Sequence, residues 1–209
     1  MSDYDYRGET QTNKDPAAQL TVEWANRSGW KGGAFLSNVR FGSSAQNGDP
    51  HLEVAPYFDF KSSLNPRWRL GTGAALYGYM FDGGGTYDYP EGYVAAEYRA
   101  VRTALYFAPD YSGRSTPGST PAWYVSFDAS TAMPHRWTLV EHAGYSFGDY
   151  WRALGGGKRF DYSLGLLHRF ARIDVSAQYI YTRRMPPVGS NAPGSSGRAI
   201  LTLTRIFSW

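Results

Sequence analysis

The side chains best suited to acid–base chemistry are four histidines: His51, His135, His142 and His168. Residue alternation predicts that only His142 lies deep in a strand on its polar face. Ser126 and Ser130 are expected on the polar face of a neighbouring strand, but a serine hydrolase also needs an ordered Ser-His-carboxylate set, and the sequence has no nucleophile elbow. We therefore expect a protein that is not an enzyme. A lipid hydrolase or acyltransferase that depends on His142 is the enzymatic alternative.

Metal, cofactor and nucleic-acid chemistry find little support in the sequence. There is no cysteine, and no histidines are paired at metal-ligand spacing. The glycine-rich stretches "FDGGGTYDYP" and "LGGGK" lack the spacing of a phosphate-binding loop. The net charge of +3 is small and the basic residues are scattered. We expect no metal, no cofactor and no nucleic-acid partner.

A larger set of polar side chains alternates with apolar residues, which predicts that they share one face of successive strands. If that face lines the lumen of a barrel, the pore-lining residues are Glu23, Glu53, Asp59, Arg69, Glu97, Arg99, Arg102, Asp128, His142, Asp161, Arg169, Asp174 and Gln178. Two interpretations stay open. The charges set a local field for small hydrophilic solutes, or opposite charges pair across the lumen and brace a closed barrel.

The elements that would position these side chains are strands, because period-2 alternation recurs between Gly, Pro, Asn and Ser clusters and helical periodicity is absent. The predicted strands span residues 2–8, 17–26, 30–42, 51–61, 67–80, 91–99, 101–109, 122–131, 136–147, 159–170, 172–182 and 198–209. The fold class is all-β. We expect a transmembrane antiparallel up-and-down β-barrel of twelve strands, or ten if the first pair is misassigned, as a single outer-membrane domain over residues 1–209.

The connections between the predicted strands alternate between long and short. Short ones such as "NRSG" and "MPH" alternate with long ones such as "GSSAQNGDP" and "RRMPPVGSNAPGSSG". Outer-membrane barrels have short periplasmic turns and longer extracellular loops, so both termini are predicted to be periplasmic. Twelve strands give a backbone cylinder of roughly 24 Å diameter, and we expect a water-filled channel with no insertion that could plug it.

Aromatic residues are sorted by strand end. An aromatic girdle at the membrane interfaces is predicted from Trp24, Trp30, Trp68, Trp123, Trp137 and Trp209, of which all but Trp123 fall at the periplasmic side. The opposite girdle is expected from Tyr93, Phe107, Tyr145, Phe147, Phe160 and Tyr181. Two charges break the pattern on the apolar face: Arg205 can extend to the headgroups, whereas Glu141 implies a β-bulge, a subunit contact or an error in register.

Several stretches also resemble a known family. "SDYDYRGETQTNKDPAAQ", "LSNVRFG", "LEVAPYFDF", "HAGYSFGDY" and "IDVSAQYIYTRR" occur in the order and spacing of the TorF-type porin family of the bacterial outer membrane. Phe35, Thr10 and the segment "ALYGYMFDGG" depart from the family pattern, which bears on solute specificity more than on fold. The resemblance implies an outer-membrane β-barrel with a porin-like role.

The expected function is a porin-like channel in the outer membrane of Gram-negative bacteria for passive transport of small hydrophilic solutes or ions. A closed structural or surface-binding barrel is the alternative, and a soluble ligand-binding barrel is a further one. The chain shows no signal peptide. The expected partners are outer-membrane lipids, the assembly machinery that recognises a terminal aromatic residue, and lipopolysaccharide. Basic residues in or beside the long loops either contact its phosphates or are simply solvated: Arg114, Arg152, Lys158, Arg183, Arg184 and Arg198.

Overall fold

The computed structural model describes residues 1–41, 49–80, 87–111, 113, 120–153, 158–185 and 195–208. It is nearly all β: one large antiparallel sheet holds eleven strands in the order β13 to β3, so each strand pairs with its neighbours in sequence. Besides strands, the described residues include the short helix α1 (Asp149–Ala153) and the 3₁₀ turn η2 (Pro134–Arg136). None of the described helices is long and apolar enough to cross a membrane.

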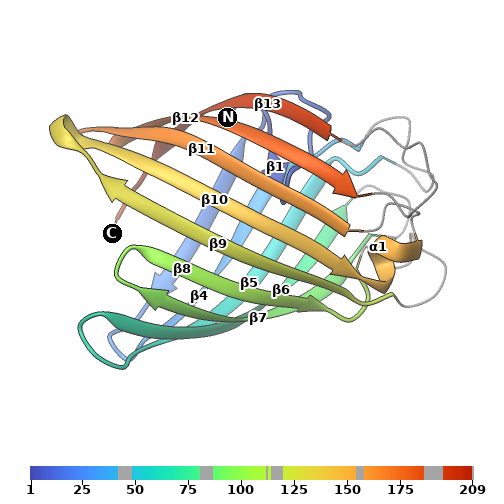
Figure 1. The fold of residues 1–209 in the computed structure, drawn as a ribbon, viewed down its shortest axis with the longest axis horizontal. Helices are drawn as coiled ribbons and strands as arrows, with labels where there is room; N and C mark the ends of the chain where they lie inside the picture. Colours follow the sequence, from blue (N-terminus) through green and yellow to red (C-terminus); the bar gives the residue numbers. More distant parts are fainter. Residues whose placement is uncertain are drawn as a thin grey trace.

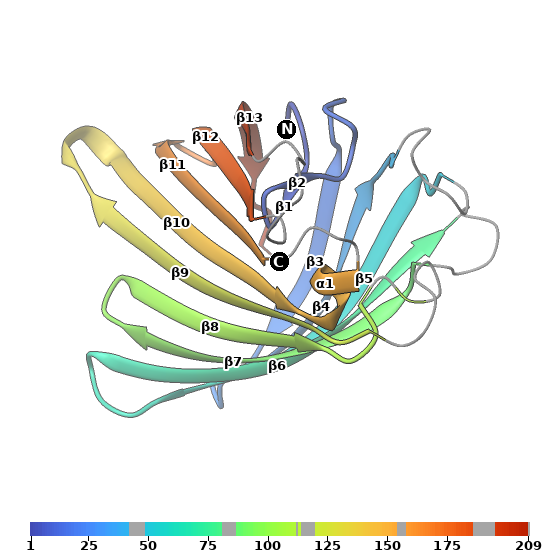
Figure 2. The ribbon, with the colours of Figure 1, turned by 45° about the vertical axis from the view of Figure 1, so that its right-hand side comes forward.

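The strands of the large sheet follow the predicted ranges closely. They are β3 (Gln19–Ala25), β4 (Trp30–Asn38), β5 (Leu52–Ser63), β6 (Trp68–Met80), β7 (Tyr89–Tyr98), β8 (Val101–Ala108), β9 (Ala122–Ala132), β10 (Trp137–Gly148), β11 (Lys158–Phe170), β12 (Ile173–Met185) and β13 (Ser195–Arg205). The all-β, up-and-down prediction is confirmed, whereas a twelfth strand of this sheet is not found among the described residues. Figures 1 and 2 show the sheet curving around an interior, with the tight turns at one end.

The predicted strand at residues 2–8 is wrong as a member of this sheet. Residues 5–10 form a separate small hairpin from β1 (Asp5–Tyr6) and β2 (Glu9–Thr10), joined by Arg7 and Gly8. Both joining residues have positive φ, 52° and 80°, the signature of a two-residue hairpin turn that reverses the chain at once. The N-terminal segment therefore turns back on itself and does not continue along the wall.

Residues 1 and 2 lie at the seam between the two edge strands. With eleven strands in antiparallel succession, β3 and β13 run in the same direction, and no ladder joins them in the described part of the chain. Met1 and Ala17 exchange backbone hydrogen bonds of 2.8 and 2.9 Å, and the amide of Ser2 donates to Leu201 of β13 at 2.8 Å. The N-terminus thus lies partway along the wall, not at the short-turn end where the C-terminal end lies (Figure 1).

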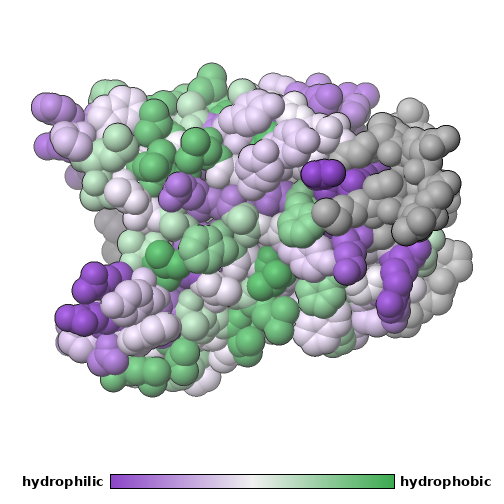
Figure 3. All heavy atoms as spheres, in the orientation of Figure 1, coloured by the Kyte–Doolittle hydropathy of each residue, from purple (hydrophilic) through white to green (hydrophobic). Residues whose placement is uncertain are grey.

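The polarity of the sheet is the reverse of that of a soluble β-protein. Large apolar side chains remain exposed on the outer face, among them Leu20, Val94, Leu164, Tyr179 and Leu201, each with more than half of its surface exposed. In Figure 3 such residues gather over the middle of the visible outer surface. Charged side chains such as Glu53, Glu91 and Asp161 are buried instead.

Two aromatic groups flank this apolar zone. Near the short turns, Trp30 contacts Phe58 and Phe60, Trp68 contacts Tyr98, and Trp137 contacts His168. At the long-loop end, ring contacts run from strand to strand along Phe107, Trp123, Phe147, Tyr145 and Phe160. That these two groups lie at membrane interfaces stays a prediction, and Trp209 lies outside the described residues.

Tyr93 does not belong to the outer group, and this prediction is wrong. Its hydroxyl donates to Asp59 at 2.7 Å, and Arg102 lies over its ring at 5.3 Å from the centroid. Tyr93 and Glu97 are four residues apart on β7, so they must share a face, and Glu97 faces inward.

The two misfit charges do lie on the outer face. Glu141 is exposed and pairs in register with Ala129 and Leu164; both ladders of β10 run without interruption there, so no bulge accounts for it. Arg205 lies at the end of β13, with its guanidinium 4.7 Å from the ring centroid of Phe207. Its place near the short turns agrees with a side chain that extends to an interface.

Candidate functional site

The N-terminal hairpin occupies the interior of the curved sheet, and we call residues 3–12 the inner hairpin (Figure 2). Asp3, Tyr4, Gln11 and Thr12 are buried. Its side chains reach strands on both halves of the sheet: Tyr4 contacts Phe35 of β4 and Glu53 of β5, and Glu9 contacts arginines of β11 and β12. The expectation that no segment of the chain could plug the interior is therefore wrong.

Arginines of the last strands hold the inner hairpin in place. Arg198 of β13 binds Asp3 at 3.0 Å and also pairs with Asp5, while its Nη1 donates to the carbonyl of Gly8 at 3.3 Å. Arg159 and Arg184 both pair with Glu9. Arg198 thus points inward to the hairpin, not outward from a loop, and it provides the closest set of charge-assisted contacts at the seam.

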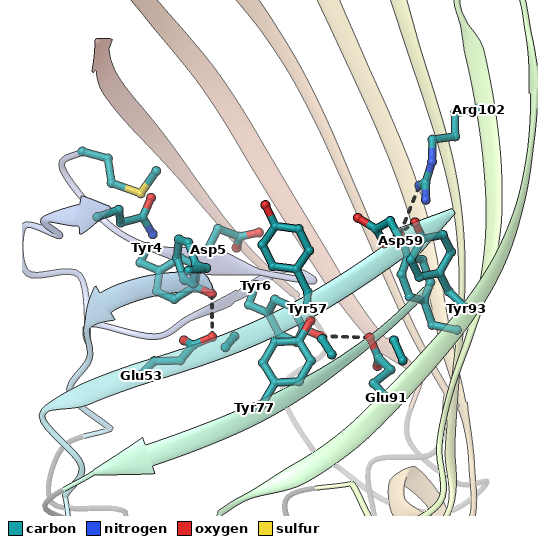
Figure 4. Close-up of a pocket in the computed structure, with 17 residues that line it drawn as sticks. Tyr4, Asp5, Tyr6, Glu53, Tyr57, Asp59, Tyr77, Glu91, Tyr93 and Arg102 are labelled. Atoms are coloured by element: carbon teal, nitrogen blue, oxygen red, sulfur yellow. Dashed lines mark hydrogen bonds between the residues drawn. The ribbon is translucent and has the colours of Figure 1, made fainter. Parts of the chain in front are cut away.

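Tyrosines and carboxylates line the opposite side of the inner hairpin (Figure 4). The hydroxyl of Tyr4 donates to Glu53 at 3.3 Å, and that of Tyr6 lies 3.5 Å from Glu91. Burial, with the nearby Glu53 carboxylate, raises the pKa of the Tyr4 phenol well above its usual value. The phenol therefore stays protonated and remains a hydrogen-bond donor.

Farther toward the short turns, a second cluster joins predicted lumen residues to a lysine. Tyr57 donates to Glu23 at 2.5 Å, and the ammonium of Lys31 lies 3.1 Å from Glu23 and 3.4 Å from Asp59. Asp59 also accepts the hydrogen bond from Tyr93. The structure thus brings Glu23 and Asp59 together through a cation that the sequence analysis did not single out.

Glu97 is the centre of a third cluster. Lys61 lies 2.6 Å from one of its oxygens and Arg69 2.9 Å from the other. Arg102 approaches the same carboxylate only at 3.9 Å and Asp128 at 3.7 Å, while it donates to the hydroxyl of Tyr106 at 3.1 Å. Arg102 is therefore the least tightly paired cation of the interior group.

His142 lies between two carboxylates. Its Nδ1 is 2.6 Å from Asp128, and its Nε2 is 3.0 Å from Asp161 and 2.8 Å from the hydroxyl of Tyr124. Ser126 donates to Asp128 at 3.1 Å, not to the imidazole. Both ring nitrogens face acceptors or a phenol, which is a bracing arrangement and not that of a base next to a serine nucleophile.

We expect His142→Ala to destabilise the folded protein by about 2 kcal/mol, because two carboxylates lose their shared partner inside the sheet. The measurement is urea unfolding in lipid vesicles followed by tryptophan fluorescence. Glu141→Ala is the matched control, since Glu141 is the adjacent residue on the opposite face and has no ion-pair partner among the described residues. Equal stabilities of the two variants would contradict the bracing role.

The remaining predicted lumen residues lie apart from these clusters. Arg99 is in the tight turn after β7, with φ of 55° and its guanidinium over the ring of Tyr98. Arg169 and Asp174 form a bidentate pair at 2.7 Å beside the turn between β11 and β12. Gln178 does line an interior cavity. The clusters therefore include most, but not all, of the residues that alternation predicted.

Three cavities follow one another through the interior. The first, of about 460 Å³, and the second, of about 590 Å³, both border the inner hairpin and share Tyr6, Tyr77 and Tyr106. The third, of about 480 Å³, lies toward the short turns. Arg102 lines all three. In the described residues, no group of His, Asp and Glu is arranged to hold a metal ion.

Sequence reasoning missed the residues that the inner hairpin brings to the site, above all Tyr4, Tyr6 and Arg7, and also Glu91 of β7. Arg7 precedes a glycine, and that dipeptide was the available signal for a turn inside the stretch predicted as a strand. Glu91 is six residues before Glu97 on the same strand, so alternation was the signal that could have placed it in the polar set. Arg114 lies outside the described residues.

The fold and its interior define a class: a single antiparallel up-and-down sheet, apolar outside and charged inside, curved around a polar interior. The chain belongs to the family described as "Bacterial protein of unknown function (Gcw_chp)", whose model matches residues 1–205. The description of this family is not that of the TorF-type porin family, which the sequence motifs resemble. No curated protein matches the chain.

Among solved structures, the chain is similar to an "Anion-selective porin from Comamonas acidovorans", with 13% identity and a TM-score of 0.45. The similarity covers 82% of this chain and 51% of the porin, so the chain spans about half of that protein's length.

Proposed function

We propose that this protein is an outer-membrane β-barrel of Gram-negative bacteria and acts as a narrow passive channel for small hydrophilic solutes. The observation that carries the proposal is the reversed polarity of the sheet. Exposed Leu, Val, Phe and Tyr side chains cover the outer face, and the charged clusters and cavities lie inside. Burying the outer face in lipid removes its apolar surface from water, which at roughly 25 cal/mol per Å² is the largest available stabilisation.

The aromatic residues support the same placement. Indole and phenol rings favour the boundary between hydrocarbon and headgroups, and the two aromatic groups of this sheet lie toward its two ends. Lys158 and Arg183 are exposed at the long-loop end, where they would meet lipopolysaccharide phosphates. These contacts are part of the proposal.

The interior supports a restricted passage and not a wide one. Three cavities lie along the interior, and the inner hairpin borders the first two. Most charges there are paired at 3.4 Å or less, so a passing solute meets a polar wall with few free charges. Only small hydrophilic molecules would pass while the inner hairpin is in place.

Planar-bilayer recording of the purified protein tests the channel proposal. We expect small discrete conductance steps, and liposome swelling with the smallest sugars only. Boiled protein is the matched control for detergent artefacts. A folded, membrane-inserted protein that shows neither steps nor swelling would overturn the proposal.

A closed structural barrel is the second candidate, and the inner hairpin is the observation that favours it. If the paired charges and the hairpin close the lumen fully, no sugar enters the liposomes, even when the inner hairpin is deleted. Swelling that appears only after this deletion would favour a closed but openable channel over a purely structural barrel.

A further inference from the structure

The guanidinium of Arg7 occupies a cage of aromatic rings and one carboxylate. Its Cζ lies 4.4 Å from the ring centroid of Tyr124, 4.9 Å from that of Tyr106 and 4.6 Å from that of Tyr6. Its Nη2 lies 2.5 Å from Glu91, and both side chains are less than a tenth exposed. Proteins recognise organic cations by surrounding them with aromatic faces in a desolvated site. Here a carboxylate completes such a site.

The sheet, not the hairpin, builds most of this cage. The ring of Tyr124 is held in position by its hydroxyl, which donates to Asp161 at 2.9 Å and lies 2.8 Å from His142. Tyr106 is fixed in the same way by Arg102. Glu91 belongs to β7. Two aromatic faces are therefore held by contacts within the sheet, and the carboxylate comes from a strand of the sheet.

The backbone at Arg7 does not favour arginine. Arg7 and Gly8 are the two central residues of a turn with positive φ at both positions, where Asn-Gly is the preferred pair. A non-glycine residue in this region carries a conformational cost unless its surroundings hold it there. The contacts of the guanidinium with the cage help to hold it, together with the hydrogen bonds that Thr182 and Arg198 donate to the carbonyl of Gly8.

From these observations we infer that Glu91, Tyr106 and Tyr124 form a binding site for guanidinium compounds, and that Arg7 is its built-in occupant. The first cavity borders Glu91 and Tyr106 of the site and is also lined by Asp5, Glu53 and Asp59, whereas the second cavity borders Arg7, Tyr106 and Tyr124. Of these carboxylates, Glu91, Asp5 and Asp59 are paired with Arg7, Arg198 and Lys31, and the two cavities leave room beside the site for the remainder of such a molecule. Guanidinium compounds would then be a solute class of the proposed channel. The inference rests on the channel proposal only for the route by which such a solute reaches the site.

Calorimetric titration of methylguanidinium into the refolded protein in detergent micelles tests the site. Arg7→Asn removes the occupant and suits the turn, so we expect it to bind methylguanidinium at least about tenfold more tightly than the wild type does. Arg7→Lys, which keeps a cation in the cage, should bind as weakly as the wild type. N-methylurea, the neutral analogue, should not bind to any variant.

The matched controls locate the binding. Adding Glu91→Gln to the Arg7→Asn variant should weaken binding by about tenfold or more, whereas adding Arg152→Asn, on exposed α1, should change nothing. A folded Arg7→Asn protein that binds methylguanidinium no better than the wild type would overturn the inference. Because titration in micelles needs no conductance, a binding variant that forms no channel would overturn the proposed function and leave the site intact.

Discussion

Gly8→Val is expected to raise the conductance of the reconstituted protein severalfold. Gly8 has φ of 80°, and a Cβ there would collide with the side chains of Asp161 and Thr182. A β-branched residue in this conformation adds backbone strain of about 1–3 kcal/mol to the collision. Since the turn cannot stay where it is, the inner hairpin should leave its place and open the path between the first two cavities. Single-channel recording measures the change.

Gly92→Val is the control for this substitution. Gly92 lies on β7, and its nearest neighbour for an added Cβ is the carbonyl of Gly73 at 3.7 Å, an ordinary contact. Its conductance should equal that of the wild type. If Gly8→Val folds, as judged by its circular dichroism, and conducts like Gly92→Val, the inner hairpin does not limit the passage.

Val94→Arg should prevent efficient folding into lipid vesicles. Val94 is 58% exposed on the outer face, where its partners in register are Thr72 and Leu105. An arginine facing the hydrocarbon near the bilayer centre costs about 2–4 kcal/mol. We expect this loss in the free energy of folding, measured by urea titration of the vesicle-bound protein.

Gln178→Arg adds the same side chain to the inner face, where Gln178 borders the cavity of about 590 Å³. Its folding free energy should change far less than that of Val94→Arg. Equal losses for the two variants would contradict the membrane placement of the outer face.

The strands of the sheet could be predicted from sequence because alternation is a local property, and each strand shows it within its own residues. Eleven of the twelve predicted ranges correspond to strands of the sheet. The same rule failed at residues 2–8, since Asp3, Tyr4, Asp5 and Tyr6 also alternate. Alternation indicates an extended chain but does not say which other segment it pairs with.

Alternation predicted several members of the interior clusters but not which of them meet, and it missed Lys31 and Lys61. Parity along a strand places Asp128, His142 and Asp161 on one face, yet their meeting depends on the register of three strands. The partners of the inner hairpin are still harder to predict from the sequence, because residues that form an ion pair, such as Asp5 and Arg198, are separated by almost the whole chain. Only the folded arrangement brings such residues together.

The contacts of residues 1 and 2 couple the wall to what occupies the interior. The segment that bridges β3 and β13 at Ala17 and Leu201 is continuous with the inner hairpin. Any molecule that withdrew the hairpin would therefore pull on the bridge between two edge strands that run in the same direction and have no ladder of their own in the described residues. We therefore expect hydrogen exchange at the backbone amides of Ser2 and Ala17 to become faster when the inner hairpin leaves the interior, because one continuous segment both bridges the edge strands and occupies the interior.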